Sequence, residues 1–131
     1  MRSARDDRTG EVPSLELPAS DRSASGGRFA PGKFHSEMIR SELEEVVGEA
    51  HVSTTDSDRL IYSCDWFWGA QMWLDRGQAL SAPDYIVHPA DVEQISRVLE
   101  IANKYKIPVI PWGGGSGTQG GATAIFGGII L

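Results

Sequence analysis

Eleven residues near the end of the chain, WGGGSGTQGGA at positions 112–122, include six glycines. Glycine adopts positive φ without steric cost and lets a ligand come within hydrogen-bonding distance of the backbone. Successive exposed N–H groups in such a turn form a concave anion site, and Ser116 and Thr118 add hydroxyl groups. The sequence therefore predicts a loop that holds phosphate, and a diphosphate fits this chemistry. A flexible surface linker is the alternative, but linkers seldom follow a buried strand directly.

A strand–helix–strand unit is predicted immediately before this loop. Residues 85–87 form a short β-prone run, and a second run follows at 107–111, where Pro108 indicates an edge or the start of a strand. A helix is predicted between them, from about 91 to 105. Its buried face should consist of Val92, Ile95, Leu99 and Ala102. Such a crossover joins parallel strands in a right-handed sense.

Two common nucleotide motifs fit the loop poorly. Residues 115–120 read G-x-G-x-x-G, the dinucleotide fingerprint, which requires a helix that opens inside the motif. Gly121, Gly127 and Gly128 leave no room for that helix. A P-loop is disfavoured as well, because no Gly-Lys-Ser/Thr sequence follows the glycines.

The preceding part of the chain divides into two segments. Residues 1–33 are rich in Arg, Ser, Gly, Asp and Pro, which predicts a disordered tail. Residues 34–80 should hold a helix from the N-cap Ser36 to about Gly48, a loop at 52–58 and an aromatic segment. The aromatic residues form either a packing cluster, which we favour, or a wall that faces a ligand or partner. They are Tyr62, Trp66, Phe67, Trp68 and Trp73.

Composition excludes several classes of protein. The formal net charge of −6, with 18 acidic and 12 basic residues, argues against a nucleic-acid surface. No apolar run approaches the length of a transmembrane span, and the first residues lack the apolar stretch of a secretory signal, so we expect a cytoplasmic protein. Cys64 is the only cysteine, which leaves no internal disulfide, and we expect no metal site. His35, His51 and His88 are more typical of surface or hydrogen-bonded histidines than of catalysts.

The run from Ala82 to the end of the chain, with the loop as its most specific part, resembles the FAD-linked oxidases of the vanillyl-alcohol oxidase superfamily. Within it, the glycolate oxidase subunit and D-lactate dehydrogenase branch is the most similar, and the resemblance begins near residue 40. The resemblance implies an α+β chain: an N-terminal helix, then the βαβ unit of an FAD-binding domain of the p-cresol methylhydroxylase (PCMH) type, over residues 81–131 and incomplete here. At residues 128–131 relatives continue a strand of the same sheet, so we expect a fragment or truncated chain with an exposed apolar edge.

The family's diphosphate loop carries over onto this sequence residue by residue. Trp112 departs from the family, in which Arg or another polar residue is common. Some relatives attach flavin through a histidine where this chain has Ser116, so the resemblance implies non-covalent FAD. The implied cofactor residues are Pro111, Gly113, Gly114, Gly115, Ser116, Gly117, Thr118, Gly120 and Gly121.

The resemblance also implies an activity. Flavin chemistry in this family removes a hydride from a C–H group beside a hydroxyl or phenolic group, and the branch implies a 2-hydroxy acid substrate bound by regions beyond residue 131. The chain alone should therefore bind FAD weakly or not at all and show no turnover, and no residue in it is identified as catalytic. Two alternatives remain open: a non-catalytic nucleotide-binding remnant or interaction subunit, and an oxidoreductase of the phenolic or alkylglycerone-phosphate type. A further subunit or C-terminal domain is an expected partner.

Overall fold

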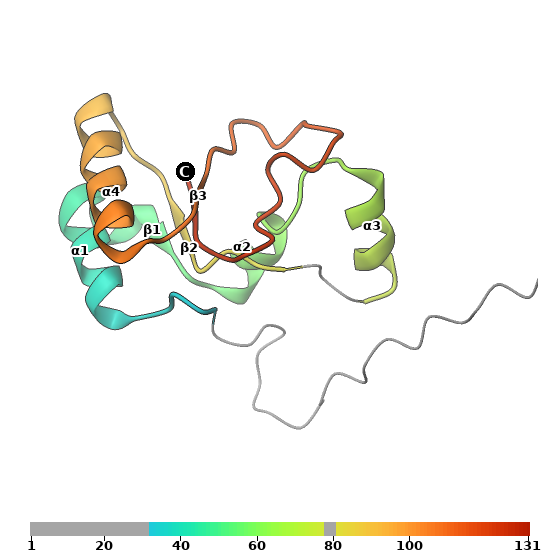
Figure 1. The fold of residues 1–131 in the computed structure, drawn as a ribbon, viewed down its shortest axis with the longest axis horizontal. Helices are drawn as coiled ribbons and strands as arrows, with labels where there is room; N and C mark the ends of the chain where they lie inside the picture. The colour runs from blue at the N-terminus through green and yellow to red at the C-terminus, as the bar shows by residue number, and fades with distance from the viewer. Residues whose placement is uncertain (1–31, 78–80) are drawn as a thin grey trace, which may run out of the picture.

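A computed structural model describes residues 32–77 and 81–131 (Figure 1). The tail predicted for residues 1–33 lies outside the described residues except for its last two. Helices and strands alternate irregularly along the chain, and the structure has the mixed α+β character that the resemblance implied. The elements are α1 (Glu37–Val47), η1 (Glu49–His51), β1 (Val52–Ser53), α2 (Asp56–Ile61), α3 (Trp68–Asp75), β2 (Tyr85–Val87), α4 (Val92–Tyr105), β3 (Val109–Ile110) and β4 (Ile129–Ile130).

The sheet confirms the predicted crossover. Its order is β1-β2-β4-β3, with β2 and β3 both parallel to β4 and with β1 antiparallel to β2. Helix α4 therefore connects two parallel strands that have one strand between them. The edge position of β3 agrees with Pro108, which has no N–H group to donate to a further strand.

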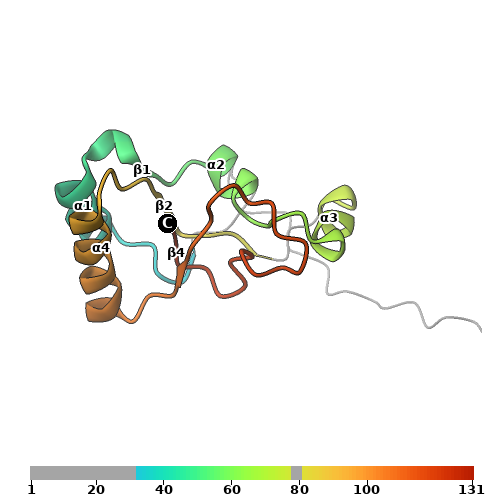
Figure 2. The same ribbon diagram turned by 90° about the horizontal axis from the view of Figure 1, so that it is seen from above.

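The two faces of the sheet bury different partners. Alternate residues of β2 and β4 point to opposite faces, as strand geometry requires. Tyr85, Val87 and Ile129 pack with α1 and α4 in the larger core, whereas Ile86 and Ile130 pack with Ala124 in a smaller one. Figures 1 and 2 both show α1 and α4 together on one side, with the connection from β3 to β4 running over the other side.

The exposed apolar edge expected near the end of the chain is wrong. Strand β4 is paired on both sides, by β2 and by β3, and Ile129 and Ile130 are 0% and 1% exposed. The error has a plain cause, because the connection from β3 folds back and places the next strand between the two earlier ones. The apolar run is thus the centre of the sheet.

The inner face of α4 differs in part from the predicted stripe. Ala102 is buried, but Val92 is 73% exposed and Leu99 is 40% exposed, while Val98 and Ile101 fill the core instead. The extent of the helix is as predicted, and the structure adds its caps: Asp91 accepts the N–H of Gln94, and Lys106 adopts the left-handed conformation. The helix is therefore present as predicted but rotated about its axis, because α1 packs against a face that the periodicity alone did not identify.

Residues 52–58 are not the loop that their polarity predicted. Val52 and Ser53 form β1 beside β2, and α2 begins at Asp56. The start of α2 is capped by Thr55, whose side-chain oxygen accepts the N–H of Asp58 at 3.2 Å. Polar residues at this position thus serve a helix N-terminus, where acidic side chains are stabilised.

The aromatic segment splits between the two interpretations. Tyr62 packs in the smaller core, as a packing cluster predicts, but Trp66 and Trp68 are 75% and 68% exposed.

Among the described residues, no helix is long and apolar enough to cross a membrane.

Candidate functional site

The connection between β3 and β4, residues 111–128, begins in a fixed turn. The N–H of Trp112 donates to the carbonyl of Leu131 at 2.9 Å, and the N–H of Gly115 donates to the carbonyl of Trp112 at 3.1 Å. The Trp112 ring meets Tyr62 edge to face, with 5.0 Å between the ring centroids. Trp112, which differs from the polar residue common in the resembled family, is therefore held in place by packing on the smaller core. The glycine loop (residues 113–121) begins directly after it.

Three glycines of the loop are required by the protein itself. A Cβ at Gly115, where φ is +63°, would lie 2.5 Å from the Trp112 ring. A Cβ at Gly117 would lie 2.8 Å from Oδ2 of Asp65, and Gly120 has φ +80° with the Phe67 ring beside it. Close packing and backbone conformation explain these positions without any ligand.

Two other glycines have no such explanation. At Gly114 and Gly121 φ is outside the left-handed region, and a Cβ would meet nothing within 4 Å. Gly113 needs its positive φ of +59° but is equally open. The free space lies where the sequence predicts that a diphosphate approaches the backbone, so these residues fit the implied cofactor.

The backbone donors of the loop are mostly unused. Within the described residues, the N–H groups of Gly113, Gly114, Ser116, Gly117 and Thr118 donate to no protein acceptor, and all five residues are exposed. The N–H of Gly115, by contrast, donates to the carbonyl of Trp112 within the turn. Free N–H groups on a glycine-rich turn are the chemistry of an anion site. The glycine density of the sequence leads us to predict that at least three N–H groups of residues 113–118 converge on a point the size of a phosphate.

The far end of the connection is held by a carboxylate that sequence reasoning missed. Asp84 is buried, and its Oδ2 accepts the N–H of Gly128 at 2.6 Å while its Oδ1 accepts the N–H of Phe34 at 3.3 Å. The signal in the sequence was a single acidic residue directly before an apolar run, whereas its contact with Gly128 is tertiary. Predicted site residues Pro111 and Thr118 are exposed at the start and middle of the connection.

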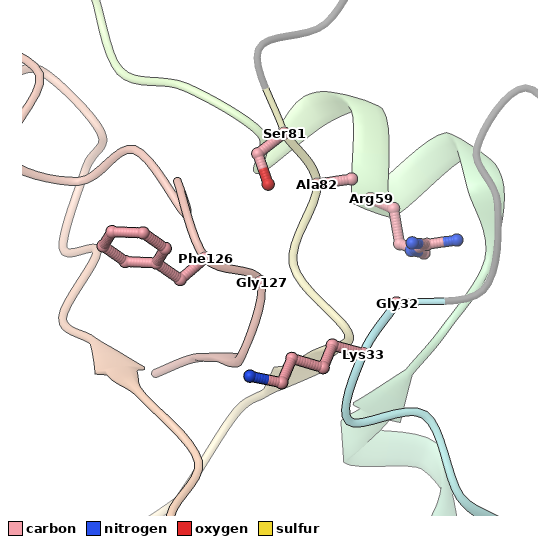
Figure 3. A pocket seen from close by; sticks show the side chains of 7 residues that line it. All are labelled: Gly32, Lys33, Arg59, Ser81, Ala82, Phe126 and Gly127. Atoms are coloured by element: carbon pink, nitrogen blue, oxygen red, sulfur yellow. The ribbon is translucent and has the colours of Figure 1, made fainter.

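A separate pocket of about 210 Å³ lies at the end of the connection (Figure 3). Arg59 and Lys33 line it together with Phe126, and the Arg59 Nε donates to the carbonyl of Pro83 at 2.8 Å. None of the implied cofactor residues lines this pocket. The glycine loop and the pocket are therefore different features of the same surface connection.

The remaining titratable residues have structural surroundings. His35 stacks on Tyr85, His88 meets Tyr62 edge to face, and His51 is exposed. Cys64 is buried, and this burial raises the pKa of its thiol. Over residues 32–77 and 81–131, no group of three or more His, Cys, Asp or Glu side chains could hold a metal ion.

Comparison with known proteins identifies the kind of domain that contains the loop. Residues 83–131 match the family model described as FAD binding domain. The chain is 29% identical over 93 residues to glycolate oxidase subunit GlcD of Bacillus subtilis (strain 168), covering 71% of this chain and 18% of that protein. It is 30% identical over 107 residues to the probable mitochondrial D-lactate dehydrogenase of Danio rerio, covering 82% and 20%. The chain thus spans about one fifth of the length of these relatives.

Solved structures agree on the fold. A structure of alkyldihydroxyacetonephosphate synthase has a TM-score of 0.69 at 24% identity and covers 77% of this chain and 21% of that one. A structure of p-cresol methylhydroxylase has a TM-score of 0.52 at 18% identity, covering 76% and 19%. The predicted resemblance, the PCMH-type fold and FAD as the cofactor of this domain are confirmed.

Proposed function

We propose, from the premise that residues 83–131 belong to an FAD binding domain, that this chain supplies the diphosphate-holding loop of an FAD-dependent oxidoreductase. The proposed substrate is a 2-hydroxy acid, oxidised at its CH–OH group. Relatives named glycolate oxidase subunit and D-lactate dehydrogenase support this substrate class. The bound flavin would supply the redox chemistry, and the residues of this chain would orient it.

A single observation carries the proposal. Gly114 is exposed, needs no positive φ, meets no other residue at its Cβ position and keeps its N–H free among the described residues. Packing of the chain therefore does not explain this glycine, whereas a diphosphate lying against the backbone does.

The resemblance suggests which part of FAD each half of the loop would contact. The first half of the loop would donate backbone N–H groups to the diphosphate, and Gly120 and Gly121 would lie toward the flavin. The full set is Pro111, Gly113, Gly114, Gly115, Ser116, Gly117, Thr118, Gly120 and Gly121. We propose no catalytic residue in this chain, and its cytoplasmic location and further subunit stay predictions.

The cofactor part of the proposal is tested by dividing FAD into its halves. The purified 131-residue chain is titrated by calorimetry with FAD, with ADP and with riboflavin, which has no phosphate. Since the loop offers backbone N–H donors, which suit a phosphate and not an isoalloxazine ring, ADP should bind within about tenfold of FAD and riboflavin should not bind. Binding of riboflavin equal to that of FAD would contradict a diphosphate site.

The substrate part needs the protein expressed from its own gene, with the coding sequence that flanks these residues. Anaerobic mixing of the flavin-loaded protein with D-lactate or glycolate should bleach the flavin absorbance. A 4-alkylphenol serves as the comparison substrate. Bleaching by the phenol alone would replace the 2-hydroxy acid with a phenolic substrate, and no bound flavin at all would favour the non-catalytic remnant.

A further inference from the structure

Asp65, in the turn between α2 and α3, is a buried carboxylate, 1% exposed. Its own segment holds it firmly, because Oδ1 accepts the N–H of Phe67 at 3.1 Å and the side chain of Gln71 donates to the Asp65 carbonyl at 3.1 Å. The position of the carboxylate is thus set independently of the glycine loop.

The same carboxylate touches both halves of the connection that contains the glycine loop. Its Oδ2 accepts the N–H of Ala122 at 3.4 Å, on the returning half. On the outgoing half, Gly117 approaches so closely that a Cβ would lie 2.8 Å from Oδ2. Residues 117 and 122 are therefore brought against one fixed group that comes from some 50 residues earlier in the chain.

The contact uses one backbone donor and leaves those of the loop free. The N–H of Ala122 is satisfied by Asp65, whereas the N–H groups of Gly113, Gly114, Ser116, Gly117 and Thr118 remain without protein acceptors in the described part of the chain. A loop so rich in glycine loses much conformational entropy when it is ordered, so a fixed contact at its middle reduces what a ligand must order.

We propose that Asp65 is a positioning residue, which holds the glycine loop in the conformation that receives a diphosphate. The inference rests on the proposed function, in that FAD is the ligand that the loop receives. A purely electrostatic role has the opposite sign, since a carboxylate behind the loop repels the dianion of a diphosphate. Its removal would then strengthen binding, whereas loss of positioning weakens it.

The test uses Asp65→Asn in the isotope-labelled 131-residue chain, with FAD titrated and the loop amides followed by NMR. The matched control is Asp84→Asn, which removes an equally buried carboxylate that accepts a backbone N–H at the far end of the same connection. Both variants should lower the unfolding temperature. Well below that temperature, Asp65→Asn should weaken FAD binding about tenfold, speed hydrogen exchange at Ala122 and shift the amides of residues 117–122, while Asp84→Asn leaves the affinity unchanged.

A second variant covers the case in which Asp65→Asn does not fold. Gly117→Ala keeps every hydrogen-bonding group but pushes against the carboxylate, so it should reproduce the loss of affinity. Unchanged or stronger FAD binding in the folded variants would overturn the proposal, and so would equal losses from Asp65→Asn and Asp84→Asn. If the protein expressed with its flanking coding sequence holds no FAD, the proposed function fails, whereas unaltered exchange at Ala122 in Asp65→Asn refutes the positioning role separately.

Discussion

At the scale of single residues, the glycines of the loop have different causes. Glycine density in the sequence predicted backbone freedom and ligand approach, but density cannot distinguish a glycine required by packing from one left open. That distinction depends on Trp112 and Asp65, whose positions against the loop are tertiary contacts. A substitution at Gly115 would collide with Trp112 in the protein itself, so this glycine cannot serve as the diagnostic for ligand binding.

Gly114 is the better diagnostic position. Gly114→Ala should leave stability unchanged or raise it by about 0.4–1 kcal/mol, since the conformation is compatible with alanine and nothing is displaced. FAD binding by this variant should be much weaker, because the methyl group occupies the proposed path of the diphosphate. Gly115→Ala should instead lower the unfolding temperature. Thermal unfolding and FAD titration of both variants measure the contrast, and undiminished FAD binding by Gly114→Ala contradicts the proposed contact.

At the scale of elements, the local sequence predicted where helices and strands form but not which faces of them pack together. The helix 92–105 followed from the apolar periodicity between two β-prone runs, whereas its caps, Asp91 and Lys106, were not predicted. Its buried face did not follow from the periodicity, because two apolar stripes overlap on this helix and only the position of α1 selects Val98 and Ile101 over Val92 and Leu99. The strand order could not be predicted from local sequence either, because β4 pairs with β2 and β3 through contacts between distant parts of the chain.

The central position of β4 leads to a stability prediction with an internal control. Ile129→Ala should destabilise the chain by about 2–5 kcal/mol, as expected for truncation of a fully buried isoleucine. Ile125 lies in the connection shortly before β4 and is 60% exposed, so Ile125→Ala should change stability by less than about 0.5 kcal/mol. Urea unfolding monitored by circular dichroism gives both values. Equal effects of the two substitutions would restore the exposed edge that the sequence suggested.

The pair of α1 and α4 supplies a pH-dependent contact. Glu42 accepts hydrogen bonds from Lys104 Nζ at 2.8 Å and from the Tyr105 hydroxyl, and these bonds lower the pKa of Glu42 below its ordinary 4.5. A lowered folded-state pKa stabilises the fold above the unfolded value, and this contribution disappears as the pH falls through the folded value. Glu42→Gln should therefore be less stable than wild type at pH 7 and indistinguishable from it at low pH.

Urea unfolding at pH 7 and at pH 3 measures this difference. The effect should be small, because Glu42 and Lys104 are partly exposed and water screens them. A stability difference that persists undiminished at pH 3 would show that the contact acts through packing and not through the charge of Glu42.

At the scale of the whole molecule, the helices that form the larger core and the connection that contains the proposed site lie on opposite faces of the sheet. Helices α1 and α4 fill one face, and the connection that carries the glycine loop crosses the other (Figure 1). The proposed site consists of consecutive residues, so a sequence pattern can suggest it, whereas the contacts of Asp65 and Trp112 with the loop are tertiary and carry no such pattern. A few backbone hydrogen bonds to a solvated diphosphate gain little net free energy, so we expect this chain alone to bind FAD weakly or not at all.

The central claim is that the glycine loop, and no other part of this chain, receives the diphosphate. It is tested most directly by mapping the backbone amides of the isotope-labelled chain as ADP is added at millimolar concentration. We predict saturable shifts at Gly113, Gly114, Ser116, Gly117 and Thr118, whose N–H groups have no protein acceptor among the described residues. Shifts confined instead to the pocket of Figure 3, at Lys33, Arg59 and Phe126, would contradict the account and move the anion site to the other end of the connection.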